Sequence, residues 1–298
     1  MERAGKPSAP GGLLSIVPTP IGNLEDITLR ALRILREADV VAAEDTRRTR
    51  TLLSAHALPA SESRLQSYHA HSGPAAADAL LDLVAAGRKV AFATDAGMPG
   101  VSDPGGELVR RAIERGVPVD VLPGSSAATT ALVASGFAGR SFRFEGFLPL
   151  KSGARGSALD LVLASPDAVV LFEAPGRLAA LLRAIAQKAP GRRVFVGREM
   201  TKLHQEYAHG TAEELAGRYE KAEPRGEATI VVAPAEPETR ETDVHDVLDE
   251  ARARVADERR DGTALRPAVR TVAASLGVPA NALYRALHES QPPEGRTR

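Results

Sequence analysis

The chain has 298 residues and no cysteine, and its 38 Lys and Arg residues equal its 38 Asp and Glu residues in number. The lack of cysteine excludes disulfides, thiolate metal sites and a cysteine nucleophile, and the charge balance excludes a global attraction to nucleic acid while leaving room for local basic patches. The length suits two domains with a small appendage.

Residues 1–12 are rich in Pro, Gly, Ala and Ser and lack an apolar core, which predicts a disordered leader and not a signal peptide. No apolar run is long enough to cross a bilayer, so we expect a cytoplasmic protein that makes no membrane contact. Aromatic residues make up only 4% of the chain, which argues against a sheet of stacking aromatic side chains for single-stranded RNA.

Short apolar runs alternate with helical patterns through residues 13–149, which predicts an N-terminal α/β domain. The expected strands are 13–17, 40–43, 65–68, 89–94, 117–122 and 142–147. The loop from Pro18 to Asn23 holds two prolines and one glycine, and so lacks the G-x-G-x-x-G pattern of a dinucleotide fold. A phosphate-binding Rossmann site is therefore disfavoured.

A cluster of charges follows the expected strand 40–43. It consists of Glu44, Asp45, Arg47, Arg48 and Arg50. Arginines at the start of a helix oppose its dipole, so their presence favours a contact with phosphate groups. A solvated face, or pairing of the arginines with the two acidic residues, explains the pattern equally well.

The histidines at positions 69 and 71 invite a metal interpretation, because their spacing places both imidazoles on one face of a strand. No third ligand accompanies them in the sequence. We therefore expect no metal site.

Two loops of small residues follow consecutive expected strands. Residues 95–104 are rich in Gly and Pro, and residues 123–128 have almost no side-chain bulk. Open α/β sheets bind ligands at the carboxyl ends of their strands, and a ligand can lie directly on backbone that carries small side chains. The loops predict a ligand cleft, although Gly and Pro also punctuate α/β proteins in general. Asp103 and Pro104 predict a helix start, with the carboxylate as its cap.

Residues 150–234 predict a second α/β domain, with the ligand cleft between the two domains. The expected strands are 168–173, 193–199, 203–210 and 227–233, with helices at 177–187 and 212–221. The middle two strands pair as a hairpin, which indicates a mixed sheet.

Residues 235–241 form a linker by composition, and residues 242–298 form a separate helical tail. In this tail Gly277 separates two helical segments, the second starting near Pro279 or Asn281, as in a helix-turn-helix. Contact with nucleic acid and packing against a partner subunit both remain open for the tail.

Eight motifs occur in order between Leu13 and Thr211, and together they resemble the tetrapyrrole-methylase-like (class III) S-adenosylmethionine methyltransferases. The motifs are VPTPIGNLEDITLRAL, AAEDTRRT, TDAGMPGVSDPG, LPGSSAATTAL, FEGFLP, LFEAPGRL, VGREMTK and HGT. VPTPIGNL, AAEDTR and the tail segment NALYRAL are most similar to the branch that methylates the 2′-hydroxyl of a cytidine in 16S ribosomal RNA. Thr94, Met98 and Gly176 depart from the residues usual in the family, which are serine, threonine and histidine.

This resemblance implies a two-domain α/β fold with a small helical C-terminal domain, S-adenosyl-L-methionine bound in the interdomain cleft, and a homodimer that acts on 16S rRNA or the small ribosomal subunit. The implied cofactor-binding residues are Pro20, Ile21, Asp95, Gly97, Met98, Ser125, Ser126, Ala127, Phe172 and Glu173. A sulfonium donor has no phosphates, so backbone groups and small residues suit it better than an anion site.

Methyl transfer to a ribose hydroxyl needs a group that takes the proton or stabilises negative charge on the oxygen. The catalytic candidates are Lys202, Glu199 and Asp45, of which we favour Lys202. Asp103 is a further candidate, or only a helix cap, and Glu199 has Arg198 as a neighbour to pair with. RNA phosphates are expected to contact Arg47, Arg48, Arg50, Arg266, Arg270 and Arg285.

Two other functions remain compatible with the sequence. A corrinoid or other tetrapyrrole could be the methyl acceptor on the same fold, although the tail and the arginine cluster count against it. A nucleic-acid-binding regulator whose α/β part senses a ligand would bind through the tail and turn nothing over.

Overall fold

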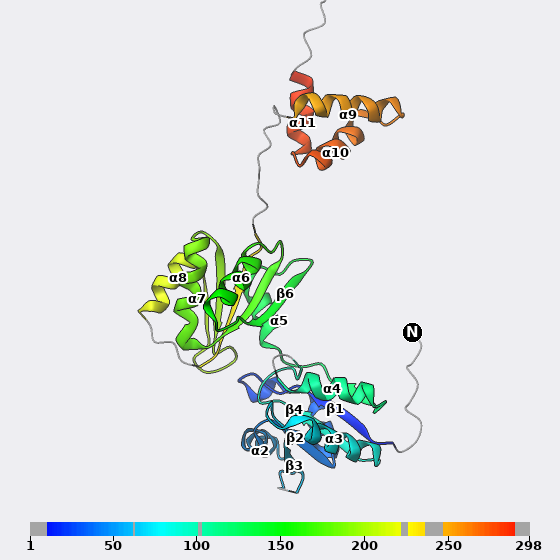
Figure 1. The fold of residues 1–298 in the computed structure, drawn as a ribbon, viewed down its shortest axis with the longest axis vertical. Coiled ribbons are helices and arrows are strands. Elements are labelled where there is room, and N and C mark those ends of the chain that lie inside the picture. The colour runs from blue at the N-terminus through cyan, green and yellow to red at the C-terminus, as the bar shows by residue number, and fades with distance from the viewer. Residues whose placement is uncertain (1–10, 62, 101–102, 222–225, 236–246, 290–298) are drawn as a thin grey trace, which may run out of the picture. The chain divides into compact units, whose positions relative to one another are not determined.

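The computed structural model describes residues 11–61, 63–100, 103–221, 226–235 and 247–289, and its elements are labelled in Figure 1. The chain divides into two compact units, Met1–Ala235 and Glu236–Arg298. Residues 1–10 of the expected leader and 236–241 of the expected linker lie outside the described residues.

The first sheet is parallel throughout, with the strand order β3-β2-β4-β1-β5. Its strands are β1 (Leu13–Val17), β2 (Val40–Ala43), β3 (Leu65–Ser67), β4 (Lys89–Ala93) and β5 (Val119–Val121). Its helices are α1 (Leu29–Glu37), α2 (Thr46–Ala55), α3 (Gly73–Ala85) and α4 (Gly105–Glu114). Because β4 and β5 flank β1, the loops that follow these strands meet at one edge.

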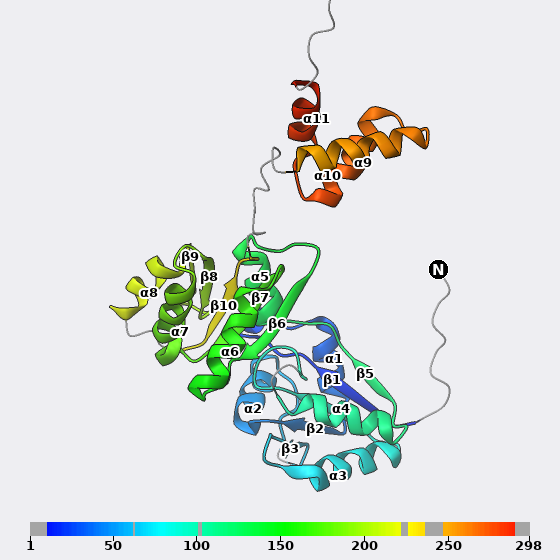
Figure 2. The ribbon, with the colours of Figure 1, turned by 45° about the horizontal axis from the view of Figure 1, so that its top comes forward.

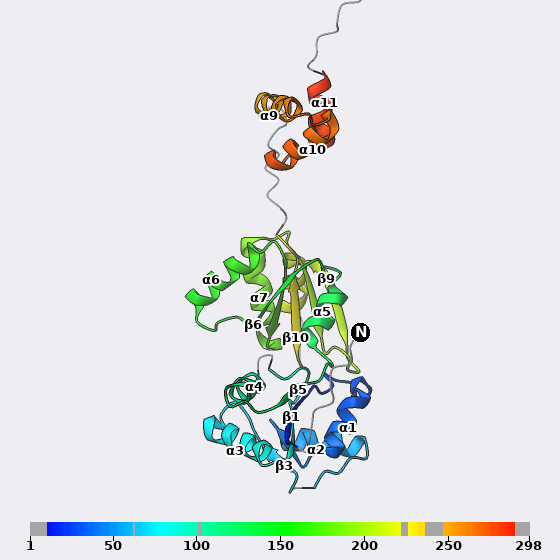
Figure 3. The same cartoon turned by 90° about the vertical axis from the view of Figure 1, so that its right-hand side faces the viewer.

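Helices cover both faces of the first sheet, as Figure 3 shows. Leu81 of α3 and Leu108 of α4 pack against one set of strand residues, including Phe92. Leu35 of α1 packs on the opposite face with Ala91. Successive residues of a strand point to opposite faces, so an apolar strand such as β4 supplies both cores.

The second sheet is mixed, as expected, with the strand order β6-β7-β10-β8-β9. β6 runs parallel to β7, whereas the other neighbours are antiparallel. The strands are β6 (Phe142–Phe147), β7 (Ala168–Glu173), β8 (Arg193–Arg198), β9 (Glu206–Thr211) and β10 (Ala228–Val232). The helices that cover one face are α6 (Ser152–Leu163), α7 (Pro175–Lys188) and α8 (Ala212–Glu220).

The other face of the second sheet is covered by α5 (Ala127–Ser135), which lies across the sheet from α7 in Figure 3. Ala131 of α5 packs with Phe195 and Val231 in one cluster. Both α5 and β6 precede residue 149 yet pack or pair within the second sheet. The expected domain boundary at 149/150 stays a prediction, with these two elements on its N-terminal side.

Two expectations about local structure are corrected. The pattern did not predict α6, whose segment contains Gly153 and Gly156. The strand expected at 203–210 begins at Glu206, because residues before it form a turn in which Glu199 and Thr201 have positive φ angles of 48° and 66°. Neither residue is glycine, so this turn is held by its contacts.

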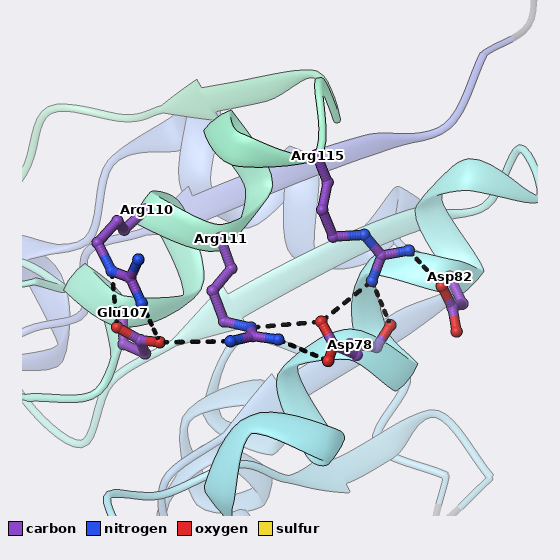
Figure 4. Close-up of polar contacts among 6 residues, drawn as sticks. All are labelled: Asp78, Asp82, Glu107, Arg110, Arg111 and Arg115. Carbon is purple, nitrogen blue, oxygen red and sulfur yellow. Dashed lines mark hydrogen bonds and ion pairs between the residues drawn. The ribbon is translucent and has the colours of Figure 1, made fainter.

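Salt bridges join α3 to α4 and fix the position of α4 (Figure 4). The guanidinium group of Arg111 donates to both carboxylate oxygens of Asp78, at 2.6 and 3.3 Å. Arg115 also contacts Asp78, at 3.2 Å, and pairs with Asp82. Two parallel bonds between an arginine and a carboxylate constrain geometry more strongly than one. The network thereby holds α4, which starts two residues after Asp103.

The C-terminal unit consists, in its described part, of α9 (Leu248–Arg260), α10 (Leu265–Leu276) and α11 (Ala280–Glu289), drawn in orange and red in Figure 2. They enclose their own core, which includes Val255, Val272 and Leu283. Gly277 ends α10 with a φ of 67°, and the N–H of Val278 donates to the carbonyl of Ala273 at 3.1 Å. The helix, glycine turn and helix of the predicted pattern are therefore present.

Candidate functional site

A cavity of about 460 Å³ lies at the carboxyl ends of the strands of the first sheet. Its walls come from the loops after β1, β2 and β4, from the start of α5, and from the ends of β6, β7 and β10 in the second sheet. This volume lies in the range of small-molecule sites. The cavity occupies the edge at which the two small-residue loops were expected to meet.

The ten cofactor candidates divide, among the described residues, into eight that line this cavity and two that do not. The eight are Ile21, Asp95, Gly97, Met98, Ser126, Ala127, Phe172 and Glu173. Pro20 instead lines a smaller pocket of about 230 Å³. The hydroxyl of Ser125 donates to the carbonyl of Asp26 at 3.1 Å.

The loops after β1 and β4 are locked to each other. Thr19 and Gly97 exchange backbone hydrogen bonds, and the hydroxyl of Thr94 donates to the carbonyl of Gly97 at 3.0 Å. Gly97 has a φ of 80°, and a Cβ atom there would lie 3.3 Å from Cγ2 of Ile21. Only glycine adopts this conformation without strain, so the sequence fixes the shape of the cavity floor here.

The wall from the second sheet is aromatic and apolar. The ring of Phe172 packs edge-on against Phe144 and Phe147, with centroid distances of 5.0 and 5.7 Å. Phe172 and Phe147 both line the cavity. Such a wall can take the face of a planar ring system.

Glu173 forms part of the same wall, but arginines neutralise its carboxylate. Its side chain is 2% exposed and accepts from Arg155 at 2.9 Å and from Arg177 at 2.6 Å. The N–H of Ala174 donates to it at 2.9 Å. A buried carboxylate needs such partners, and here they leave little of its charge for a ligand.

Asp95 and Asp103, on the side of the first sheet, also have partners. Asp95 accepts from the N–H of Asp45 at 2.9 Å and contacts Arg48 at 3.5 Å. Asp103 accepts from the N–H of Gly105 at 2.7 Å, as a cap at the start of α4, and from the N–H of Gly100 at 2.7 and 2.9 Å. The carboxylate of Asp103 thus bonds a free N–H at the start of α4, as expected, although Pro104 and not Asp103 occupies the N-cap position.

Glu44 also lines the cavity, although the sequence placed it only in a cluster of charges and not among the catalytic candidates. It follows β2 directly, and its Oε1 atom is buried without a hydrogen-bond partner in the described structure. Burial, followed by the negative charges of Asp103 and Asp95, raises the pKa of Glu44 to about 7, and Arg48 opposes this shift. Its place at the carboxyl end of a parallel strand was the available signal.

Lys202 is connected to the cavity wall through its contact with Glu227. Its Nζ donates to Glu199 at 2.9 Å and to Glu227 at 3.1 Å, and Glu227 lines the cavity. Burial alone would lower the pKa of Lys202, but the hydrogen bonds to the two glutamates outweigh it and the pKa lies above its usual value. Lys202 is therefore a cation at neutral pH and not a proton acceptor.

Asp45 caps α2 through the N–H of Arg47 at 2.9 Å and receives two further bonds from the Arg47 side chain. These bonds hold the pKa of Asp45 well below its usual range. A carboxylate so stabilised is a weak base.

The arginine candidates differ in their surroundings. Arg48 lines the cavity, whereas the Arg47 side chain is 86% exposed beside Asp45. Arg270 and Arg285 are exposed residues of the C-terminal unit. Arg266, in the same unit, stacks over the ring of Tyr284, with 6.0 Å between the guanidinium carbon and the ring centroid.

Within the described ranges, no group of three or more His, Asp or Glu side chains is placed to hold a metal ion. The ring Nδ1 of His69 instead accepts from the N–H of His71 at 3.2 Å. None of the described helices combines the length and the apolar character needed to cross a membrane.

Comparison with known proteins gives consistent matches. The sequence model of the family described as Tetrapyrrole (Corrin/Porphyrin) Methylases matches residues 13–216. The Ribosomal RNA small subunit methyltransferase I of Thermotoga maritima is 46% identical over 222 residues, covering 74% of this chain and 98% of that protein. The protein of the same name from Bacillus subtilis is 36% identical over 283 residues, covering 94% of this chain and 95% of that protein.

A solved structure shows the same fold. The uroporphyrin-III C-methyltransferase of Thermus thermophilus, complexed with S-adenosyl homocysteine, superposes with a TM-score of 0.52 at 23% identity. The match covers 75% of this chain and 97% of that one.

Proposed function

This chain belongs to the tetrapyrrole (corrin/porphyrin) methylase family, and from that premise we propose that it transfers a methyl group from S-adenosyl-L-methionine to small-subunit ribosomal RNA. The acceptor we propose is the 2′-hydroxyl of a cytidine ribose in 16S rRNA. Two relatives described above support this proposal. Both are named for small-subunit rRNA methylation, and the longer match covers 94% of this chain. The tetrapyrrole acceptor is not favoured, because the relatives with 46% and 36% identity are named for small-subunit ribosomal RNA.

The cavity suits this methyl donor by its chemistry. Small residues such as Gly97 and Ala127 leave backbone groups accessible, and Phe172 offers a flat apolar wall. Asp95 provides negative charge for a ligand that carries a sulfonium cation and no phosphate. The single observation that carries the proposal is this cavity, lined by eight of the ten residues expected at the cofactor.

When bound, the donor supplies an electrophilic methyl group on sulfur. The residues of the chain would then hold donor and ribose in line, which alone removes much of the barrier between two reactants. We propose that the positive charge of Lys202 lies near the reacting oxygen and that Glu199 and Glu227 hold Lys202 in place. Asp45 would act through Arg47, by fixing the start of α2.

We propose that Arg47, Arg48 and Arg50 in the first unit, and Arg270 and Arg285 in the second, contact RNA phosphates. Arginine matches phosphate geometry with two parallel hydrogen bonds, and such contacts make affinity fall with salt. We further propose that the protein acts in the cytoplasm, as a homodimer, where small ribosomal subunits are its partner.

The test uses labelled S-adenosylmethionine with small ribosomal subunits from cells that lack this modification, followed by mapping of the labelled nucleotide. We expect label on a single cytidine ribose of 16S rRNA. Transfer to a tetrapyrrole in place of RNA would identify a different acceptor. Tight RNA binding without any transfer would indicate a regulator. Either result would overturn the proposal.

A further inference from the structure

We propose that Glu44 is the catalytic base, the group that accepts the proton of the attacking ribose hydroxyl during methyl transfer. This inference rests on the proposed function and assigns a role within the same cavity. Glu44 belongs to the AAEDTRRT motif but was not among the catalytic candidates expected from the sequence.

The position of Glu44 sets it apart from the other acidic residues that line the cavity. Asp95 and Asp103 accept hydrogen bonds from backbone N–H groups, and Glu173 is held by two arginines. Glu227 pairs with Lys202. Glu44 lines the cavity, and its Oε1 atom is buried with no hydrogen-bond partner in the described structure, so the protein itself leaves a lone pair of this carboxylate unused.

An unpartnered buried carboxylate oxygen costs stability, and proteins keep such groups where function needs them. Glu44 follows Ala43, the last residue of β2, which is fully buried in the sheet. The buried strand therefore fixes the backbone position from which the Glu44 side chain extends. Sites built on strands hold reacting groups more precisely than sites on loops.

The charges around Glu44 adjust its proton affinity. Burial, with Asp103 and Asp95 nearby, raises its pKa to about 7 against the opposing effect of Arg48. From the second sheet, Glu173 and Glu227 line the same cavity, each paired with cations. A proton acceptor with a pKa near the working pH is more effective than a strongly stabilised carboxylate such as Asp45.

The transfer step balances with Glu44 as base. A lone pair of the ribose O2′ forms the new bond to the methyl carbon, and the carbon–sulfur bond breaks with its electron pair passing to sulfur. The O2′ proton passes to the Glu44 carboxylate, which later releases it to water. One negative and one positive charge disappear together, so no net charge develops in the cavity.

The same arrangement predicts a coupling between donor binding and the ionisation of Glu44. A sulfonium cation in the cavity favours the carboxylate form of Glu44, whereas the neutral thioether of S-adenosylhomocysteine does not. Near pH 7, binding of the sulfonium donor should therefore release up to about half a proton, because an acid at its pKa is half protonated. Binding of the thioether product should release much less.

Two measurements test the base, with Glu44→Gln as the variant and Glu37→Gln as the control. Glu37 ends α1 and forms ion pairs with Lys89 and Arg33. Calorimetry in buffers of different ionisation enthalpy counts the protons released on binding of S-adenosylmethionine and S-adenosylhomocysteine. Single-turnover transfer to small ribosomal subunits then gives the dependence of the rate on pH.

We expect wild type and Glu37→Gln to release a fraction of a proton when the donor binds. We expect their transfer rate to rise with pH and to level off below pH 7, because the bound donor lowers the pKa of Glu44. We expect Glu44→Gln to release none, to bind S-adenosylhomocysteine within about threefold of wild type, and to lose about 100-fold or more in rate. A Glu44→Gln enzyme that keeps the wild-type rate and pH profile overturns the inference. Loss of S-adenosylhomocysteine binding also overturns it, since Glu44 would then be a ligand of the donor.

Failure of the proposed function is a separate result. If wild-type enzyme binds the donor but transfers no methyl group to ribosomal RNA, the proposed function is wrong and the base inference falls with it. If wild type transfers the methyl group and Glu44→Gln behaves identically, the base inference alone is wrong.

Discussion

Thr19 and Gly97 hydrogen bond to each other in both directions, with the N–H of Thr19 3.1 Å from the carbonyl of Gly97 and the reverse pair at 2.9 Å. This exchange joins the loops after β1 and β4, which are separated by most of the first sheet in sequence. The floor of the cavity is thus set before any ligand arrives, which lowers the entropy lost on binding.

Gly97→Ala should disrupt this floor. Its φ of 80° is unfavourable for alanine, and the added Cβ atom would lie 3.3 Å from Cγ2 of Ile21. We expect affinity for S-adenosylhomocysteine to fall about tenfold or more, as measured by calorimetry, because about 1.4 kcal/mol corresponds to a factor of ten. Gly87→Ala is the matched control, since Gly87 has a φ of 88° and open space around it. Equal affinities in the two variants would contradict this account.

Glu44→Gln should stabilise the protein in alkaline solution. Below the unfolded-state pKa of 4.5 the Glu44 carboxyl is protonated in both states, and the stability this provides is lost as pH rises toward about 7. Glutamine does not titrate, so the variant avoids this loss. Because the side chain is only partly buried, water screens much of the penalty and about 1 kcal/mol remains, or roughly 2–4 °C in melting temperature.

Thermal unfolding between pH 4 and pH 8 checks this prediction. The melting temperatures of Glu44→Gln and wild type should agree at the acid end and diverge in favour of the variant above neutrality. A constant difference across the range would show that Glu44 does not titrate as described.

Lys202→Met should separate binding from chemistry. The pKa of Lys202 is raised by Glu199 and Glu227 in spite of burial, so the side chain contributes a positive charge and no base. We expect a loss of about 100-fold or more in single-turnover rate, as for removal of one electrostatic stabiliser, with unchanged affinity for S-adenosylhomocysteine. Lys202→Arg should restore part of the rate. Retained turnover in Lys202→Met would rule out a role at the reacting oxygen.

Removing Arg270 or Arg285 should make the affinity for RNA less dependent on salt concentration. Each phosphate contact that is removed lowers the slope of log affinity against log salt by about 1. We expect Arg270→Ser and Arg285→Ser to show this in filter binding to small-subunit RNA. Arg183→Ser is the control, because Arg183 pairs with Glu220 on the surface of α7 and α8. RNA affinity that does not vary with ionic strength would exclude the arginine contacts.

Local patterns were sufficient to predict most strands and the small-residue loops, since apolar runs and the Gly and Pro residues that end them are contiguous in sequence. The pattern failed at α6, where Gly153 and Gly156 weaken the helical signal and contacts with the second sheet supply the stability. Phe172 and Gly97 were found through motifs, and the structure places both at one cavity.

The raised pKa of Glu44 could not be predicted from its neighbours in the sequence. Its burial and the nearness of Asp95 and Asp103 depend on loops that lie about fifty residues or more along the chain. The pairing of Lys202 with Glu227, 25 residues further on, is equally non-local. Sequence spacing suggested which residue types gather at the edge of the sheet, whereas their ionisation follows from the folded arrangement.

The packing of α5 restricts how the protein can be recombined with its relatives. The helix begins at the cavity with Ala127, yet Ala131 and Leu132 are buried with Phe195 and Val231 of the second sheet. A chimaera joined near residue 149 would unite this helix with a foreign sheet surface. The two parental proteins would then need complementary side chains where α5 packs on the second sheet, or the hybrid would not form the same cavity.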